Sequence, residues 1–72
     1  MAIDQQHVER YFADHPPRDD QKKQYKKIRN AAKAFAMVIL DNTPSSADQS
    51  CAIRHVRDAC SAANMAIACG GM

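Results

Sequence analysis

The sequence predicts an all-α protein in which a short N-terminal helix precedes a long antiparallel helical hairpin. Two long segments carry apolar residues at alternating steps of three and four, which is the spacing of one helical face. Proline and glycine occur only at Pro16-Pro17, Pro44 and Gly70-Gly71, which lie before, between and after those segments. We expect residues 1–72 to form one domain, because so short a chain holds at most one small core.

The opening segment, residues 1–13, is predicted to contain the short helix. Its larger apolar residues fall on one side: Val8, Tyr11 and Phe12. A helix of this length is marginal in isolation, so we expect it to dock on the hairpin or on a neighbouring subunit. Residues 14–18 are expected to form a turn, because Pro16 and Pro17 cannot continue a helix.

The first hairpin helix is expected over residues 19–42. Its apolar positions are Tyr25, Ile28, Ala32, Phe35 and Ile39. Asp19 and Asp20 stand in the first turn, where carboxylates suit the positive end of the helix dipole. Asn42 is expected to end the helix in a left-handed conformation, followed by a loop at residues 43–46.

The second hairpin helix is expected over residues 47–69. It repeats the spacing with Ile53, Val56, Cys60, Ala63 and Ile67. Ser46 and Gln49 are spaced as a capping box at its start. Because the loop before it is short, the two helices are predicted to pack antiparallel.

The end of this second helix indicates self-association. No charged residue follows Asp58, and small or apolar side chains occur around almost the whole circumference. One partner helix covers only one stripe, so the remaining surface must meet another chain or stay exposed. We therefore expect an obligate homo-oligomer.

The sequence predicts no enzyme activity, no metal and no cofactor. The three cysteines, Cys51, Cys60 and Cys69, are nine residues apart, whereas zinc sites use pairs two to four apart. We interpret all three as small buried thiols. The sequence lacks a nucleophile beside a base, paired carboxylates and a glycine-rich phosphate loop. Neither a membrane span nor a signal peptide is recognisable, which predicts a cytosolic protein.

The run from Arg18 to Lys33 is the strongest functional signal. It holds seven Lys or Arg and two Asp, a net charge of +5 in a chain whose total is +2. Four of these cations share one helical face: Lys22, Lys26, Arg29 and Lys33. A solvated face that keeps the protein soluble is the simplest explanation. Solubilising faces usually alternate in sign, however, whereas this one is cationic and begins beside an aromatic turn.

Phosphate and a planar ring are the ligand groups that this arrangement suits. Lysine binds phosphate as a point charge and arginine adds a fork of donors. An aromatic residue at the turn could stack on a nucleobase, although such a ring more often belongs to a core. The predicted site comprises Tyr11, Phe12, Pro16, Pro17, Lys22, Lys26 and Arg29. A weaker basic group on the second helix comprises Arg54, His55 and Arg57, where pairing of Arg54 with Asp58 is a structural alternative.

Three stretches resemble the helical-hairpin sponge proteins of bacteriophages, the anti-CBASS proteins, whose hairpin is shared with one class of anti-Thoeris proteins. They are His15-Pro16-Pro17, residues 24–36 (QYKKIRNAAKAFA) and residues 63–68 (ANMAIA), within a resemblance over about residues 12–70. The resemblance implies a homohexamer that captures cyclic oligonucleotides without cleaving them. It places the protein in the cytoplasm of the infected bacterial host, with neither a membrane nor a long nucleic acid as partner.

The resemblance also implies roles for individual residues. Tyr11 matches an aromatic that stacks on a base of a cyclic dinucleotide such as cyclic GMP–AMP, and Lys26 matches a phosphate-binding lysine. The basic group Arg54, His55 and Arg57 is the candidate for a separate cyclic-trinucleotide site between subunits. Members of the family often have an aromatic just before the His-Pro-Pro turn, where this chain has Asp14. The stacking ring could therefore be Phe12 instead.

Two other functions remain open. A small basic helical hairpin could bind RNA or DNA, with the steep salt dependence that phosphate contacts produce. Alternatively, the hairpin could be a purely structural bundle whose basic face meets an acidic protein partner.

Overall fold

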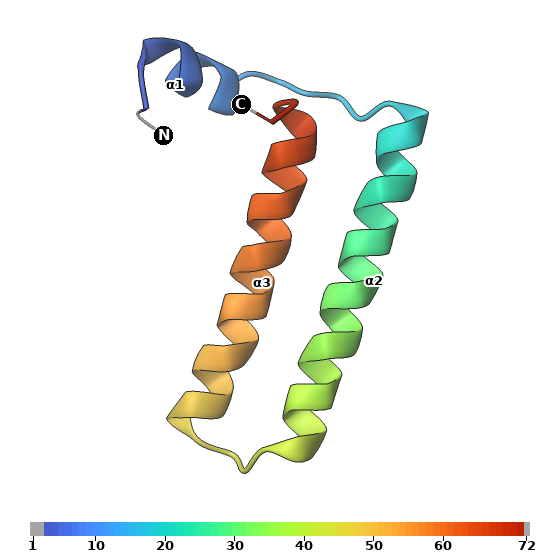
Figure 1. The fold of residues 1–72 in the computed structure, drawn as a ribbon, viewed down its shortest axis with the longest axis vertical. Coiled ribbons are helices and arrows are strands. Elements are labelled where there is room, and N and C mark those ends of the chain that lie inside the picture. The colour runs from blue at the N-terminus through green and yellow to red at the C-terminus, as the bar shows by residue number, and fades with distance from the viewer. Residues whose placement is uncertain (1–2, 72) are drawn as a thin grey trace.

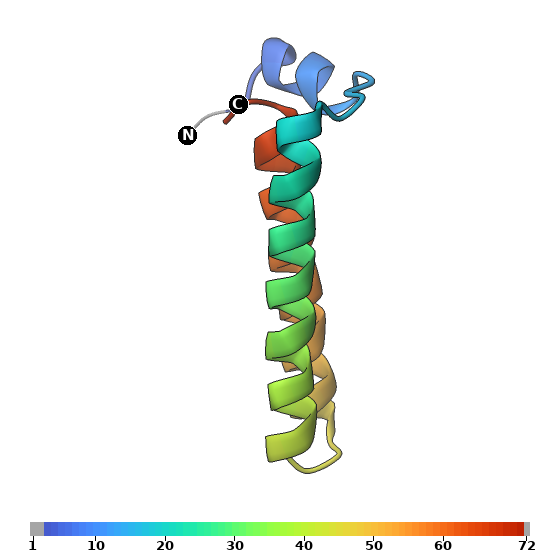
Figure 2. The same cartoon turned by 90° about the vertical axis from the view of Figure 1, so that its right-hand side faces the viewer.

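The computed structural model describes residues 3–71, which form three helices and no strand. They are α1 (Gln5–Tyr11), α2 (Asp19–Asn42) and α3 (Ala47–Ala68). α2 and α3 run antiparallel as one long hairpin (Figure 1). α1 lies beside the end of α3, and the linker that follows α1 crosses this end of the hairpin to the start of α2. Seen edge-on, the hairpin is a single layer of two helices (Figure 2). The prediction of an all-helical hairpin preceded by a short helix is confirmed.

Asp4 caps the first helix. Its Oδ1 accepts hydrogen bonds from the backbone N–H of His7 at 3.0 Å and from His7 Nδ1 at 2.8 Å. The backbone bond, and then the side-chain bond, lowers the pKa of Asp4 below its ordinary value of 3.8, because both favour the carboxylate. The ring of His7 in turn lies edge-on to Tyr11, with ring centroids 6.1 Å apart.

We expect acid to release α1 from its cap. Because the folded-state pKa of Asp4 is lowered, the carboxylate stabilises the helix fully above the ordinary pKa of 3.8, and this contribution is lost as the pH falls below it. The helical Cα chemical shifts of residues 5–11, followed by NMR, should be constant at higher pH and move toward their unfolded values below about pH 4. Asp4→Ala should show reduced helical shifts at every pH. Full helical shifts in the wild type at pH about 2.5 would contradict the cap's role.

The end of α2 differs from its prediction. Within residues 3–71 no residue other than glycine has a positive φ, so the prediction of a left-handed conformation for Asn42 is wrong. Asn42 is still helical, and its Nδ2 donates to the Val38 carbonyl at 2.8 Å. Thr43 Oγ1 donates to the Ile39 carbonyl at 2.6 Å. These side-chain donors satisfy carbonyls of the last turn, so a left-handed residue is not needed.

The start of α3 has one half of the predicted capping box. Ser46 Oγ accepts from the Gln49 N–H at 3.1 Å. The Gln49 side chain instead donates to the carbonyls of Leu40 at 3.3 Å and Thr43 at 3.0 Å. It therefore ties α3 to the loop and to the end of α2.

The two glycines end α3 in a Schellman motif. Gly70 N–H donates to the Ile67 carbonyl at 3.2 Å, and Gly71 N–H donates to the Ala66 carbonyl at 2.8 Å. Their φ values are 63° and 83°, a conformation that glycine adopts without strain.

The seam between α2 and α3 is only half-buried. In the described part of the chain, Cys69 alone is fully buried, and Phe35, expected in the seam, is 58% exposed. The interpretation of all three cysteines as buried is wrong for Cys51, which is exposed, whereas Cys60 is half-buried. A two-helix layer covers one stripe of each helix, so residues outside that stripe remain open. A chain this small with so little core depends on further contacts for stability.

Candidate functional site

Tyr11 and Phe12 line a groove of about 530 Å³ at the end of the hairpin, here called the aromatic groove. The remaining lining residues come from α3 and the chain after it: Ala62, Met65, Ala66 and Gly71. Tyr11 is half-buried, whereas Phe12 is 86% exposed. The groove therefore offers one ring fixed by its surroundings and one ring open to solvent.

The cationic face of α2 is exposed along its length. Lys22 Nζ lies 3.6 Å from Asp19 Oδ1, an ion pair within the first turn of the helix. Lys26, Arg29 and Lys33 are likewise exposed. Exposed lysines remain mobile and keep their hydration until an anion arrives, so this face is suited to reversible phosphate binding.

Arginine from α3 joins this face. A groove of about 290 Å³, here called the basic groove, brings together Arg29, Lys33 and Arg57 beside Ser61. Its other lining residues are apolar: Ala32, Ala36, Ile53, Val56 and Cys60. Three basic residues from two helices thus border one groove, and no carboxylate is among its lining residues. Basic residues grouped in this way favour an anionic ligand such as a phosphodiester.

The predicted dinucleotide residues do not meet in one groove. Tyr11 and Phe12 line the aromatic groove and Arg29 lines the basic groove, whereas Lys22 and Lys26 line neither of them. Among its described lining residues, the aromatic groove has none from α2, and the basic groove has none from α1. Pro16 and Pro17 are exposed in the linker between these helices. One protomer therefore presents rings and cations on different surfaces.

The second predicted group is also divided. Arg57 lines the basic groove, and its Nε lies 3.8 Å from Asp58 Oδ1. The structure thus pairs Asp58 with its sequence neighbour, and Arg54 is exposed. His55 instead borders the third groove described below. Arg54 and Arg57 are three residues apart and share one side of α3, whereas His55 is turned by about 100° from Arg54. The three residues therefore do not all face one ligand from a single chain.

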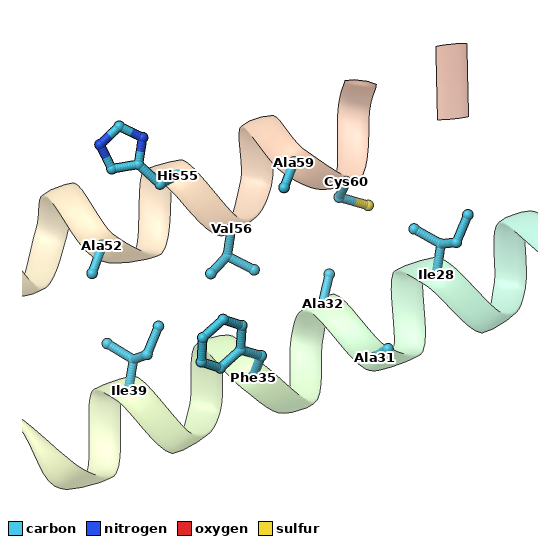
Figure 3. Close-up of a pocket in the computed structure, with 10 residues that line it drawn as sticks. All are labelled: Ile28, Ala31, Ala32, Phe35, Ile39, Ala52, His55, Val56, Ala59 and Cys60. Atoms are coloured by element: carbon cyan, nitrogen blue, oxygen red, sulfur yellow. The ribbon is translucent and has the colours of Figure 1, made fainter. Parts of the chain in front are cut away.

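A third, apolar groove of about 600 Å³ follows the middle of the hairpin. In Figure 3, Phe35 and Ile39 of α2 point toward Val56 of α3, while His55 turns away from α2. The further lining residues are small or aliphatic: Ile28, Ala31, Ala32, Ala52, Ala59 and Cys60. Such an open apolar surface is typical of a protein interface.

Sequence reasoning assigned Lys33 to the cationic face but did not pair it with Arg57. The signal was present in the hairpin itself, because a loop at residues 43–46 sets residues 29–33 opposite residues 57–61. The sequence patterns did not predict the contact between Arg10 and Cys69, which are 59 residues apart in the chain. No spacing pattern indicates a bond between one arginine and a distant backbone carbonyl.

None of the helices in residues 3–71 is long and apolar enough to cross a membrane. The same residues include no cluster of three His, Cys, Asp or Glu side chains arranged to hold a metal ion.

Residues 4–68 match the family model described as Acb2/Tad1, hairpin domain. The match includes α1, the linker and the complete hairpin. No curated protein and no solved structure matches the chain. The family match confirms the resemblance to the anti-CBASS and anti-Thoeris sponge proteins of phages. By its sequence, the chain belongs to the Acb2/Tad1 hairpin family.

Proposed function

We propose that this protein is a phage sponge that binds cyclic oligonucleotide second messengers and sequesters them without degrading them. The observation that carries the proposal is the basic groove, which Arg29, Lys33 and Arg57 border without a carboxylate among the lining residues. Its ligands are cyclic dinucleotides such as cyclic GMP–AMP, and also cyclic trinucleotides. Sequestration in the cytoplasm of the infected bacterium keeps CBASS effectors inactive. Lysine, arginine and aromatic side chains bind such ligands but supply no activated nucleophile, so the protein is not an enzyme.

Self-assembly supports this function because a cyclic dinucleotide presents two bases and two phosphates at once. In one chain the rings and the cations line different grooves. Copies related by symmetry bring the aromatic groove of one chain to the cationic face of another, which forms a complete site. The apolar groove, with Phe35 58% exposed, provides surface for such contacts. We propose a homohexamer, as in the sponge family.

The proposed roles follow from chemistry and exposure. Tyr11 or Phe12 stacks on a base, and Pro16 and Pro17 form a fixed rim. The phosphates are held by Lys22, Lys26 and Arg29. For a cyclic trinucleotide the proposed contacts are Arg54, His55 and Arg57. Since His55 and Arg57 border different grooves, such a site requires contributions from more than one chain.

Isothermal titration provides the direct test. Cyclic GMP–AMP and cyclic tri-adenylate should each bind, and chromatography after denaturation of the protein should recover them unchanged. The corresponding linear dinucleotide, which lacks the closed ring, is the control and should bind more weakly. Absence of binding by every cyclic nucleotide tried would overturn the proposed function.

Lys26→Ala is expected to weaken cyclic dinucleotide binding by roughly 10- to 100-fold, which is the value of a hydrogen bond to a charged group. Lys23→Ala is the matched control. It removes the same charge from an exposed position of α2 outside the predicted site, and it should change affinity little. Native mass spectrometry should show the same assembly for both variants. Equal affinities would show that Lys26 does not contact phosphate.

RNA binding is the second candidate, favoured by the continuous cationic face of α2. It predicts retention of hairpin or duplex RNA in a gel shift and a steep fall in affinity with salt. Cyclic dinucleotides would then compete poorly with the polymer. A sponge predicts the reverse result in both measurements.

A further inference from the structure

Arg10 joins the first helix to the end of the last one. Its Nε donates to the Cys69 carbonyl at 2.9 Å. In return, the Cys69 thiol donates to the Arg10 carbonyl at 3.7 Å. His15 Nε2 lies 2.6 Å from that carbonyl and 3.9 Å from Cys69 Sγ. Arg10, His15 and Cys69 therefore form a connected group, here called the clamp, around the one fully buried side chain in residues 3–71.

Electrostatics explains why an arginine occupies this position. The last turn of α3 has no basic residue of its own, although the carbonyls at a helix C-terminus carry partial negative charge. Arg10 supplies that missing cation from α1. A Cβ added at Gly70 would lie 3.5 Å from Arg10 Nη2, so the guanidinium rests directly against the turn that ends α3.

The clamp affects the position of residues in the aromatic groove because Tyr11 and Phe12 immediately follow Arg10 in the chain. The opposite side of that groove is formed by α3, through Ala62, Met65 and Ala66. With seven residues, α1 is too short to be stable by itself. If it were not held on α3, the half-buried ring of Tyr11 would lose its fixed position relative to that surface.

We infer that Arg10 is a positioning residue: through His15 and Cys69 it holds α1 against α3 and so presets the ring of Tyr11 for ligand, without contacting the ligand. Ordering this ring before binding lowers the entropic cost of binding and raises affinity. This inference rests on the proposed function for its consequence in binding. The clamp itself can be tested without any ligand.

The three cysteines provide the ligand-free test. Cys69 reports on the clamp, half-buried Cys60 reports on the hairpin, and exposed Cys51 is an internal standard. Alkylation of the full chain by iodoacetamide, followed by peptide mass spectrometry, gives each rate separately. Arg10→Ala should raise the Cys69 rate by about tenfold or more, the effect of losing a charged hydrogen bond, with Cys60 and Cys51 unchanged. An unchanged Cys69 rate, or a parallel rise at Cys60 from general unfolding, would overturn the inference.

The binding test compares Arg10→Ala with Arg18→Ala. Both variants remove one positive charge, but Arg18 is exposed and pairs only weakly with Asp20, its Nε lying 3.5 Å from Oδ1. Cyclic GMP–AMP affinity should fall about tenfold in Arg10→Ala and little in Arg18→Ala, at low and at high salt alike. Equal affinities for Arg10→Ala and the wild type would overturn the positioning role. If the wild type binds no cyclic nucleotide, the proposed function fails, while faster Cys69 labelling still supports the clamp.

Discussion

Replacing Phe35 with aspartate is expected to convert the proposed homohexamer into monomers at micromolar concentration and to lower the helix content. Phe35 is 58% exposed in the chain and lines the apolar groove of about 600 Å³. A carboxylate enclosed there between copies would lose its hydration without gaining a partner, at a cost of several kcal/mol. Because the isolated hairpin has almost no enclosed core, separated chains should also unfold readily.

Sedimentation and native mass spectrometry measure the change in assembly, and circular dichroism measures the loss of helix. Phe35→Leu keeps an apolar side chain and should preserve the oligomer. Asn30→Asp changes the charge of the chain by the same amount at an exposed position of α2 outside the groove, and it should also assemble. If the Phe35→Asp variant keeps the mass and helix content of the wild type, the apolar groove is not the interface.

The fold was predictable because its main determinants are local. Apolar steps of three and four identify a helical face, and Pro44 and Gly70 prevent continuation of the helices that precede them. The errors at Asn42 and Cys51 have a different cause. A side-chain bond to the Val38 carbonyl replaced the left-handed ending, and a two-helix layer left Cys51 uncovered. Periodicity identifies faces of a helix, but it does not say how many of those faces a neighbour covers.

The candidate site was less predictable because its parts meet through tertiary contacts. Proximity in the sequence grouped Tyr11 with Arg29, yet the two residues line different grooves. It also grouped His55 with Arg57, although they border separate grooves. The cations themselves were identifiable from composition and spacing. Their position beside Arg57 of α3 follows from the hairpin register, which the loop at residues 43–46 implies but which the prediction of the site did not use.

Removing the ring of Tyr11 is expected to reduce cyclic dinucleotide affinity by roughly 5- to 150-fold, the value of one base–aromatic stack. Tyr11 and Phe12 differ in how far their rings are ordered before ligand binds. Tyr11 is half-buried and lies edge-on to His7 with 6.1 Å between ring centroids, so its orientation is already defined. Phe12 is 86% exposed and must be ordered when ligand binds. Since prior ordering lowers the entropic cost of binding, Tyr11→Ala should have the larger effect.

Titration of Tyr11→Ala, Phe12→Ala and Tyr11→Phe with cyclic GMP–AMP separates the contributions of the two rings. Tyr11→Phe keeps the stacking surface and should bind nearly as well as the wild type, and native mass spectrometry should show unchanged assembly in all three variants. A larger loss in Phe12→Ala would assign stacking to the exposed ring, so that the ligand itself orders its own binding surface. Unchanged affinity in both alanine variants would remove the aromatic groove from the site and leave the basic groove to account for binding by charge alone. Affinity would then fall steeply with salt, whereas a stacked base retains part of its binding energy when the phosphates are screened.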